Sequence, residues 1–134
     1  MKQRYYWAML LGVLVVTVVS TVMANLGWYN PLERLANRLP WGDKFGHFVL
    51  AGGLAFTLNL ILRARKIVKL WVAIYWSDVI IGALAILEEG SQVWFPARSV
   101  SFSDLMAGLL GMVLMNRMAA FFIHRQAVRT HDNT

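Results

Sequence analysis

Apolar residues in this chain come in four long blocks rather than at amphipathic spacing. The blocks cover residues 8–26, 45–62, 70–87 and 105–123. Each approaches the roughly 17–25 residues that a helix needs to cross a lipid bilayer. A soluble domain is about half apolar, and its apolar residues are broken up along each element, whereas this chain is 58% hydrophobic in blocks. The pattern therefore predicts an all-α membrane protein with little chain left for a soluble domain.

We expect a single domain, residues 1–134, with about four transmembrane helices and both termini on the same side. The expected spans are residues 6–27, 44–62, 68–89 and 103–123. The fourth is the least regular, because Asn116 and Arg117 interrupt it. An arginine near a membrane boundary can extend its charged head toward water, so the span is retained.

The first block also has the outline of a signal peptide. Lys2 and Arg4 precede the apolar core, and Val22, Met23 and Ala24 resemble a small-residue cleavage site. The apolar run is long for a signal core, which favours a retained helix that contributes little beyond anchoring. The mass of the mature protein would distinguish the two cases.

The lysines and arginines predict which helix ends face the cytoplasm. Nine of them lie near the two ends of the chain or between the second and third blocks: Lys2, Arg4, Arg63, Arg65, Lys66, Lys69, Arg117, Arg125 and Arg129. The other two connections hold only Arg34, Arg38, Lys44 and Arg98. By the positive-inside rule, both termini are cytoplasmic. The net charge of +6 therefore reflects membrane topology, with the lipid bilayer as partner and no nucleic acid.

The first outer connection has the signature of a short interfacial helix over residues 31–39. Asn30 can cap it, with Pro31 in its first position and Glu33 three residues after the cap. Its apolar face would lie on the outer leaflet. Three aromatic residues flank it as headgroup-level anchors: Trp28, Tyr29 and Trp41.

Asp43 and His47 open the second span and lie four residues apart, so they share a helical face. A carboxylate beside an imidazole orients the ring, which is the minimum for a general base or a metal ligand. The alternative is a helix cap next to an interfacial histidine.

Glu88 and Glu89 end the third span, where adjacent acids repel each other and oppose the helix dipole. Gln92 is three and four residues away and can touch either carboxylate. Arg98 can bind a phosphate or pair with these acids. The alternatives are that Glu88 and Glu89 form a solvated helix end and that Arg98 is an ordinary loop charge.

The fourth helix has a cap signal and a small-residue stripe at its start. Ser101 or Ser103 can cap it, and Asp104 in its first turn complements the helix dipole. Gly108 and Gly111 allow another helix to pack closely. The predicted topology places seven of the polar residues at one membrane face: Asp43, His47, Glu88, Glu89, Gln92, Arg98 and Asp104.

Asp78 stands apart, near the middle of the predicted third span. A charge at that depth is costly and usually marks function. Asp78 is eleven residues before Glu89, close to three helical turns, so both project from nearly the same face. The two interpretations are a proton path and a neutral aspartic acid that is hydrogen-bonded inside the bundle.

Four short motifs follow one another along the chain: Asp43-Lys44-x-x-His47-Phe48, Glu89-x-x-Gln92, Pro96-x-Arg98, and Asp104 followed by Gly111. In order and spacing they resemble the pattern of VanZ-like membrane proteins, over roughly residues 41–111. Asn often stands in that family where this chain has Gly108, which favours a packing role for this glycine.

The resemblance implies a small integral membrane protein of the cell envelope, in a family whose founding member is associated with resistance to the glycopeptide teicoplanin. It supplies no reaction, so substrate and enzymatic activity stay open. It points to one functional set: Asp43, Lys44, His47, Glu89, Gln92, Arg98 and Asp104.

Our first hypothesis is that the outer polar residues bind, or chemically alter, a lipid-linked or anionic headgroup of an envelope precursor or phospholipid. The residues expected to act catalytically are His47, Glu89, Asp43 and Asp104. The residues expected to bind are Lys44, Gln92, Arg98 and Glu88. A metal form of this hypothesis stays open, since four of the residues are of types that bind cations: Asp43, His47, Glu89 and Asp104. One histidine among carboxylates does not indicate a particular metal, so no metal site and no cofactor are assigned.

Two further hypotheses belong to other classes. The protein could be a structural or assembly protein whose polar residues only hold helix ends together, because buried polar groups need partners. It could also be a proton-coupled carrier through Asp78, acting as a homo-oligomer because four short helices barely enclose a path.

Overall fold

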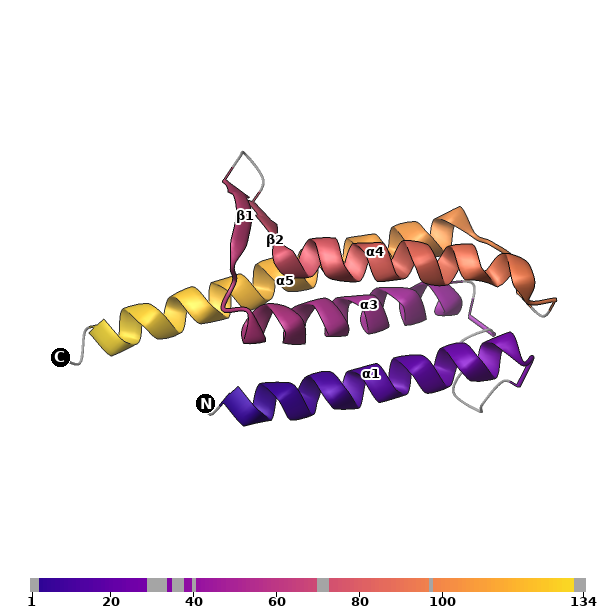
Figure 1. The fold of residues 1–134 in the computed structure, drawn as a ribbon, viewed down its shortest axis with the longest axis horizontal. Coiled ribbons are helices and arrows are strands. Elements are labelled where there is room, and N and C mark those ends of the chain that lie inside the picture. The colour runs from indigo at the N-terminus through magenta and orange to yellow at the C-terminus, as the bar shows by residue number, and fades with distance from the viewer. Residues whose placement is uncertain are drawn as a thin grey trace.

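The described chain is a bundle of long helices with a small β-hairpin at one end. The computed structural model describes residues 3–28, 34, 38–39, 41–69, 73–96 and 98–131. Its elements are α1 (Gln3–Asn25), α3 (Gly42–Ile61), β1 (Lys66–Lys69), β2 (Ala73–Tyr75), α4 (Trp76–Ser91), the 3-10 turn η1 (Gln92–Trp94) and α5 (Phe102–His131). The helices lie side by side with alternating direction, and both ends of the chain lie at the same end of the bundle (Figure 1).

Three helices are long and apolar enough to cross a membrane: Gln3–Asn25, Gly42–Ile61 and Phe102–Val128. They carry large apolar side chains on their outer surfaces, including Val15, Val19, Leu110 and Leu114. Helices that are apolar on both their inner and outer faces are typical of membrane spans. This indicates a multi-pass membrane protein. The predicted interfacial helix 31–39 lies mostly outside the described residues.

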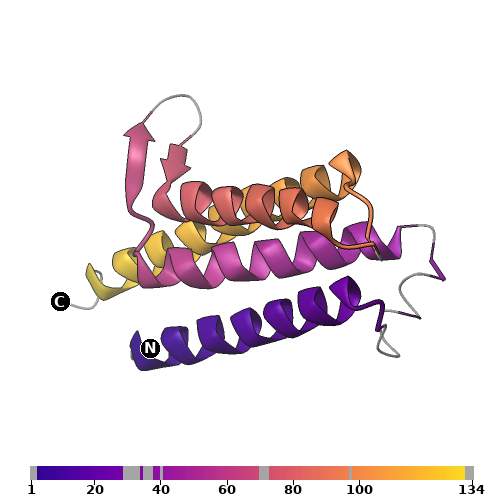
Figure 2. The same cartoon turned by 45° about the vertical axis from the view of Figure 1, so that its right-hand side comes forward.

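The expected start of the third span is wrong. Residues 66–69 and 73–75 pair as an antiparallel hairpin, with Lys69 opposite Ala73 and Lys66 opposite Tyr75. The β-branched residues Ile67, Val68 and Ile74 favour strands over helix. The hairpin projects away from the helices (Figure 2). Helix α4 has 16 residues, about 24 Å, which is shorter than a hydrocarbon core of about 30 Å.

Helices α3 and α5 form the closest contact in the bundle, and glycines make it possible. A Cβ atom on Gly111 would clash with the backbone oxygen of Phe48, and one on Gly52 would lie 3.0 Å from the backbone oxygen of Gly111. Gly108 faces the Cβ of Ala51 at 3.6 Å. The predicted packing role of the small residues in the fourth helix is confirmed. Helix α4 joins this pair through an apolar core of Leu54, Ala55, Ile81 and Met112.

A second link joins α3, α4 and α5 near the hairpin through a network centred on Asn116. The Asn59 Nδ2 donates to the Asn116 backbone oxygen at 3.0 Å, and the Ser77 Oγ donates to the Asn116 Oδ1 at 3.1 Å. The Asn116 Nδ2 donates to the Asp78 Oδ1. Asn59, Ser77 and Asn116 are fully buried. Asn116 therefore ties three helices together instead of merely interrupting one.

The expectation that Asp78 lies near the middle of a span is also wrong. It occupies the third position of α4, because the residues before Trp76 form the hairpin and not helix. Its Oδ2 accepts the backbone N–H of Tyr75 at 2.8 Å and lies 3.6 Å from the Arg117 Nη1. The Arg117 guanidinium also covers the Tyr75 ring, 5.0 Å from its centroid. These are the contacts of a helix cap with a charged partner, and they do not favour a proton path.

Candidate functional site

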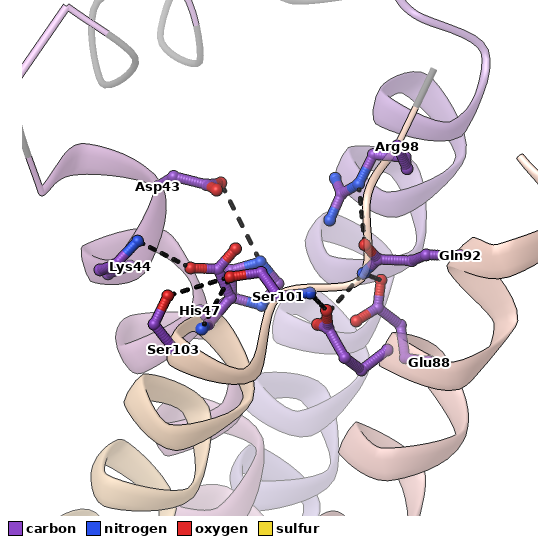
Figure 3. A network of polar contacts seen from close by, with 10 residues as sticks. Asp43, Lys44, His47, Glu88, Gln92, Arg98, Ser101 and Ser103 are labelled. Carbon is purple, nitrogen blue, oxygen red and sulfur yellow. Dashed lines mark hydrogen bonds and ion pairs between the residues drawn. The ribbon is translucent and has the colours of Figure 1, made fainter. Parts of the chain in front are cut away.

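The polar residues singled out from the sequence meet (Figure 3) at the end of the bundle opposite the chain termini (Figure 1). They lie where α3 and α5 begin and where α4 ends. We call the following set the end cluster: Asp43, Lys44, His47, Glu88, Glu89, Gln92, Arg98 and Asp104. Chain direction explains the meeting, because antiparallel neighbours bring the start of one helix beside the end of the next.

Lys44 and Asp104 connect α3 to α5. The Lys44 Nζ lies 3.1 Å from the Asp104 Oδ1, and Asp104 is only 6% exposed. The Asp104 backbone N–H points to the Ser101 Oγ at 3.4 Å, so Ser101 caps α5 as expected for one of the two serines. A carboxylate in the first turn is further stabilised by the helix dipole.

Gln92 lies at the centre of the second half of the cluster and is almost completely buried. Its Nε2 donates to the Glu88 Oε1 at 3.2 Å and to the Glu89 Oε2 at 3.3 Å. Its Oε1 accepts from the Arg98 Nε at 3.3 Å. The spacing allowed a contact with either acid, and the structure shows both. Arg98 reaches the acids through Gln92 rather than by direct pairing.

Glu89 is the most buried of the four acids in the end cluster, at 4% exposed. Besides Gln92, its carboxylate accepts the backbone N–H of Ser101, which ties the loop before α5 to the end of α4. Residue types could not reveal this contact, because the donor is a main-chain group twelve residues away. Within the described part of the chain, no lysine or arginine nitrogen lies within 4.0 Å of Glu88 or Glu89.

His47 lies between the two halves of the cluster. Its Nε2 is 4.0 Å from the Asp43 Oδ1, which agrees with the shared helical face expected from their spacing. Two groups have potential ligand atoms within 4.8 Å of one another, and both include this imidazole: Asp43 with His47 and Asp104, and His47 with Glu88 and Glu89. The imidazole can therefore join either set of carboxylates in holding a cation.

A groove of about 760 Å³ opens onto the end cluster. Its lining combines apolar residues of α1, α3 and α4, such as Val18, Leu50 and Ile81, with six residues of the cluster. The residues of the cluster that line it are Asp43, His47, Glu88, Glu89, Arg98 and Asp104. Helix α1 forms one wall of the groove, in addition to the anchoring role expected of it.

The aromatic pair Trp94 and Phe95, which follows α4, does not close this groove. Trp94 is 77% exposed, and neither Trp94 nor Phe95 is among the residues that line it. Trp41, at the start of α3, is likewise 71% exposed, and Trp28 after α1 is 67% exposed. Exposed tryptophans at helix ends are typical of the membrane interface, and these three lie at the same end of the bundle as the end cluster.

Comparison of the chain with models of known protein families, with curated proteins and with solved structures found no match. The groove and the end cluster are therefore the observations from which function is inferred.

Proposed function

We propose that this chain is a VanZ-like protein of the bacterial inner membrane that binds a lipid-linked envelope precursor or a phospholipid, with the headgroup at the end cluster and the chain in the groove. The observation that carries the proposal is one continuous groove with apolar walls and a charged end. Through such a ligand the protein would affect the cell envelope and its susceptibility to glycopeptides, in keeping with the resemblance.

The apolar part of the groove suits a lipid chain. Its volume falls within the roughly 300–1,000 Å³ of small-molecule sites. The lining residues of α1 run from Leu14 to Ala24, which is about 15 Å of helix. Thr17 adds no free polar group to this wall, because its hydroxyl donates to the Val13 carbonyl of its own helix at 2.8 Å. An extended acyl or isoprenoid chain would bury apolar surface along this wall.

The charged part offers Arg98 to an anion. Its Nε is used by Gln92, and among the described residues no carboxylate lies within ion-pair distance of its guanidinium. A guanidinium binds phosphate through two parallel hydrogen bonds. Lys44 is a second cation of the cluster, although Asp104 already holds it. His47 and the nearby acids could then transfer a proton to or from the bound group.

The membrane arrangement that fits this function has four crossings. In it, α4 is a short crossing, and the basic residues of the hairpin and of the helix ends beside it face the cytoplasm. Support comes from the position of Arg63, Arg65 and Lys66 at the same end of the bundle as both termini. Negatively charged lipid headgroups on the cytoplasmic side would attract these residues. The end cluster then faces outward.

Cysteine labelling tests this orientation, because the chain contains no cysteine. Val93 is 71% exposed beside the end cluster, and Ile67 is 41% exposed on the hairpin. A membrane-impermeant maleimide is expected to label Val93→Cys in intact cells and Ile67→Cys only after permeabilisation. If Ile67→Cys were labelled in intact cells and Val93→Cys were not, the hairpin would face outward and the end cluster would face the cytoplasm.

A matched pair of tryptophan substitutions tests the groove. Val18 lines it, whereas its neighbour Val19, 50% exposed, does not. We expect Val18→Trp to reduce the binding of polyprenyl phosphate and phosphatidylglycerol, measured by native mass spectrometry of the purified protein, and Val19→Trp to leave it unchanged. Arg98→Gln is expected to weaken binding about tenfold or more, since a hydrogen bond to a charged group contributes roughly 1.5–3 kcal/mol. Equal binding by all three variants would refute the proposal.

A second candidate, a structural or assembly role, is favoured by the mutual contacts inside the cluster, such as Lys44 with Asp104. It predicts that cluster variants lower the amount of folded protein. A substitution at His47 discriminates between the two roles. The approach of His47 to Asp43 in the described part is long, at 4.0 Å, so loss of the imidazole removes little structural support. His47→Ala at normal abundance with a lost glycopeptide phenotype supports ligand binding, and reduced abundance supports the structural role.

A further inference from the structure

We propose that His47, Glu88 and Glu89 form a binding site for one divalent transition-metal cation, and that this cation contacts the anionic group of the ligand. The metal site stands on its own observations. Its contact with the ligand rests on the proposed function.

The first observation is the charge balance of the end cluster. Four carboxylates face two cationic side chains, which leaves a formal charge of −2 while His47 is neutral. Lys44 is held by Asp104, and Arg98 is bonded to Gln92. An anionic headgroup would therefore meet a surface of its own sign, which opposes association. A bound divalent cation would neutralise this excess of negative charge.

The second observation is an uncompensated pair of carboxylates. Glu88 and Glu89 are adjacent, Glu89 is 4% exposed, and within the described residues neither has a lysine or arginine partner within 4.0 Å. Buried charges in proteins are paired or coordinate metals. The amide of Gln92 touches both carboxylates, and the Ser101 N–H touches Glu89. A carboxylate has about four lone-pair positions, so acceptor capacity remains on both.

The third observation is the convergence of suitable ligand atoms. One atom each from His47, Glu88 and Glu89 lies within 4.8 Å of the others. Two ligands of a tetrahedral zinc ion, each at about 2.1 Å, lie roughly 3.4 Å apart. Side-chain rotations that bring these atoms closer by up to about 1.4 Å would therefore let all three bind one ion. One imidazole with two carboxylates suits zinc or manganese. All three residues line the groove, so an open coordination position would face it.

The neighbouring group of Asp43, His47 and Asp104 is less suitable. Asp104 is already neutralised by Lys44 at 3.1 Å, and the Asp43 side chain is 58% exposed. By contrast, Glu88 and Glu89 have hydrogen-bond partners that orient them, in the way that outer partners orient metal ligands elsewhere. The cation would therefore be held on the α4 side of His47, next to Arg98.

Calorimetric titration of the full-length protein in detergent, after treatment with a chelator, tests the metal site with Mn²⁺ and Zn²⁺. We expect one equivalent to bind, and His47→Ala and Glu88→Gln to weaken binding by more than about tenfold, because loss of even an outer hydrogen-bond partner of a ligand costs roughly 10–100-fold. Monodispersity on size-exclusion chromatography checks that both variants fold. No binding, or binding weakened by Asp43→Asn but not by Glu88→Gln, would overturn the site.

The contact between the cation and the ligand is tested by native mass spectrometry. Binding of polyprenyl phosphate and of phosphatidylglycerol is measured once with Mn²⁺ and once with chelator. We expect at least about tenfold tighter binding with the metal, and no such gain in Glu88→Gln. Equal lipid binding in both conditions would overturn the role of the metal in recognition and leave the proposed function standing. If the lipids bind in neither condition but calorimetry still shows metal binding, the proposed function is refuted and the metal site stands.

Discussion

Replacement of Gly111 by alanine is expected to disrupt the packing of α3 against α5, whereas the same change at Gly12 is expected to be tolerated. The new Cβ at position 111 would clash with the Phe48 backbone oxygen and would lie 2.8 Å from its carbonyl carbon and 2.9 Å from its Cα. All three are backbone atoms, so no side-chain rotation relieves the clash. At Gly12, a Cβ would meet nothing within 4 Å.

The expected cost of Gly111→Ala is about 3 kcal/mol or more, at the upper end of what overpacking costs in protein cores. Gly108→Ala gives an intermediate control, since its Cβ would meet the Cβ of Ala51 at 3.6 Å, an ordinary contact. Thermal unfolding of the purified variants in detergent should rank Gly111→Ala far below the other two. If all three glycine variants unfold at the same temperature, the α3–α5 contact is not as close as described.

Replacement of Asn116 by alanine is expected to loosen α4 from the rest of the bundle. The substitution removes the acceptor for Ser77 and the donor to Asp78 but keeps the backbone oxygen that Asn59 uses. Hydrogen bonds between membrane helices contribute about 0.6 kcal/mol on average and up to about 1.7, so two of them predict a loss of roughly 1–3 kcal/mol. Ser77, fully buried, would also lose this partner.

A double-mutant cycle with Ser77→Ala checks this assignment. Because the two side chains share one hydrogen bond, the double variant is expected to lose less stability than the two single variants together. Leu114→Ala, two residues away on α5 and 48% exposed, controls for a change on the same helix outside the network. Strict additivity of Asn116→Ala and Ser77→Ala would show that this hydrogen bond contributes nothing to stability.

Much of the end cluster could be inferred from local spacing. Asp43 and His47 were expected on one face because helix geometry fixes what lies four residues apart, and Gln92 was expected near either glutamate for the same reason. Ser101 as a cap follows from residue type and position. The placement of Arg98 on Gln92, and of the Ser101 N–H on Glu89, depends on the path of a loop, which spacing does not give.

The wrong start of the third span and the wrong depth of Asp78 have the same cause. The apolar block at residues 70–87 predicted a helix from its composition alone, and that placed Asp78 at mid-membrane. In the structure, strand pairing satisfies the backbone before Trp76, so α4 starts there, and the Asp78 carboxylate in its first turn accepts the N–H of the capping residue Tyr75. Hydropathy counts apolar residues without regard to which backbone groups pair, so it could not separate the hairpin from the helix that follows.

The sequence by itself determined three helices long enough for a membrane and the polar character of particular helix ends, because length, apolar content and capping are properties of contiguous residues. Tertiary structure alone decided which of these residues meet. The glycines of α3 and α5 bring the helices into backbone contact, and α1 stands against α3 so that a groove leads to His47. Glu88 and Glu89 then face that imidazole without a cationic partner in the described chain. The glycine contacts and the approach of Glu88 and Glu89 to His47 join residues 40 or more positions apart, and their geometry depends on how whole helices pack.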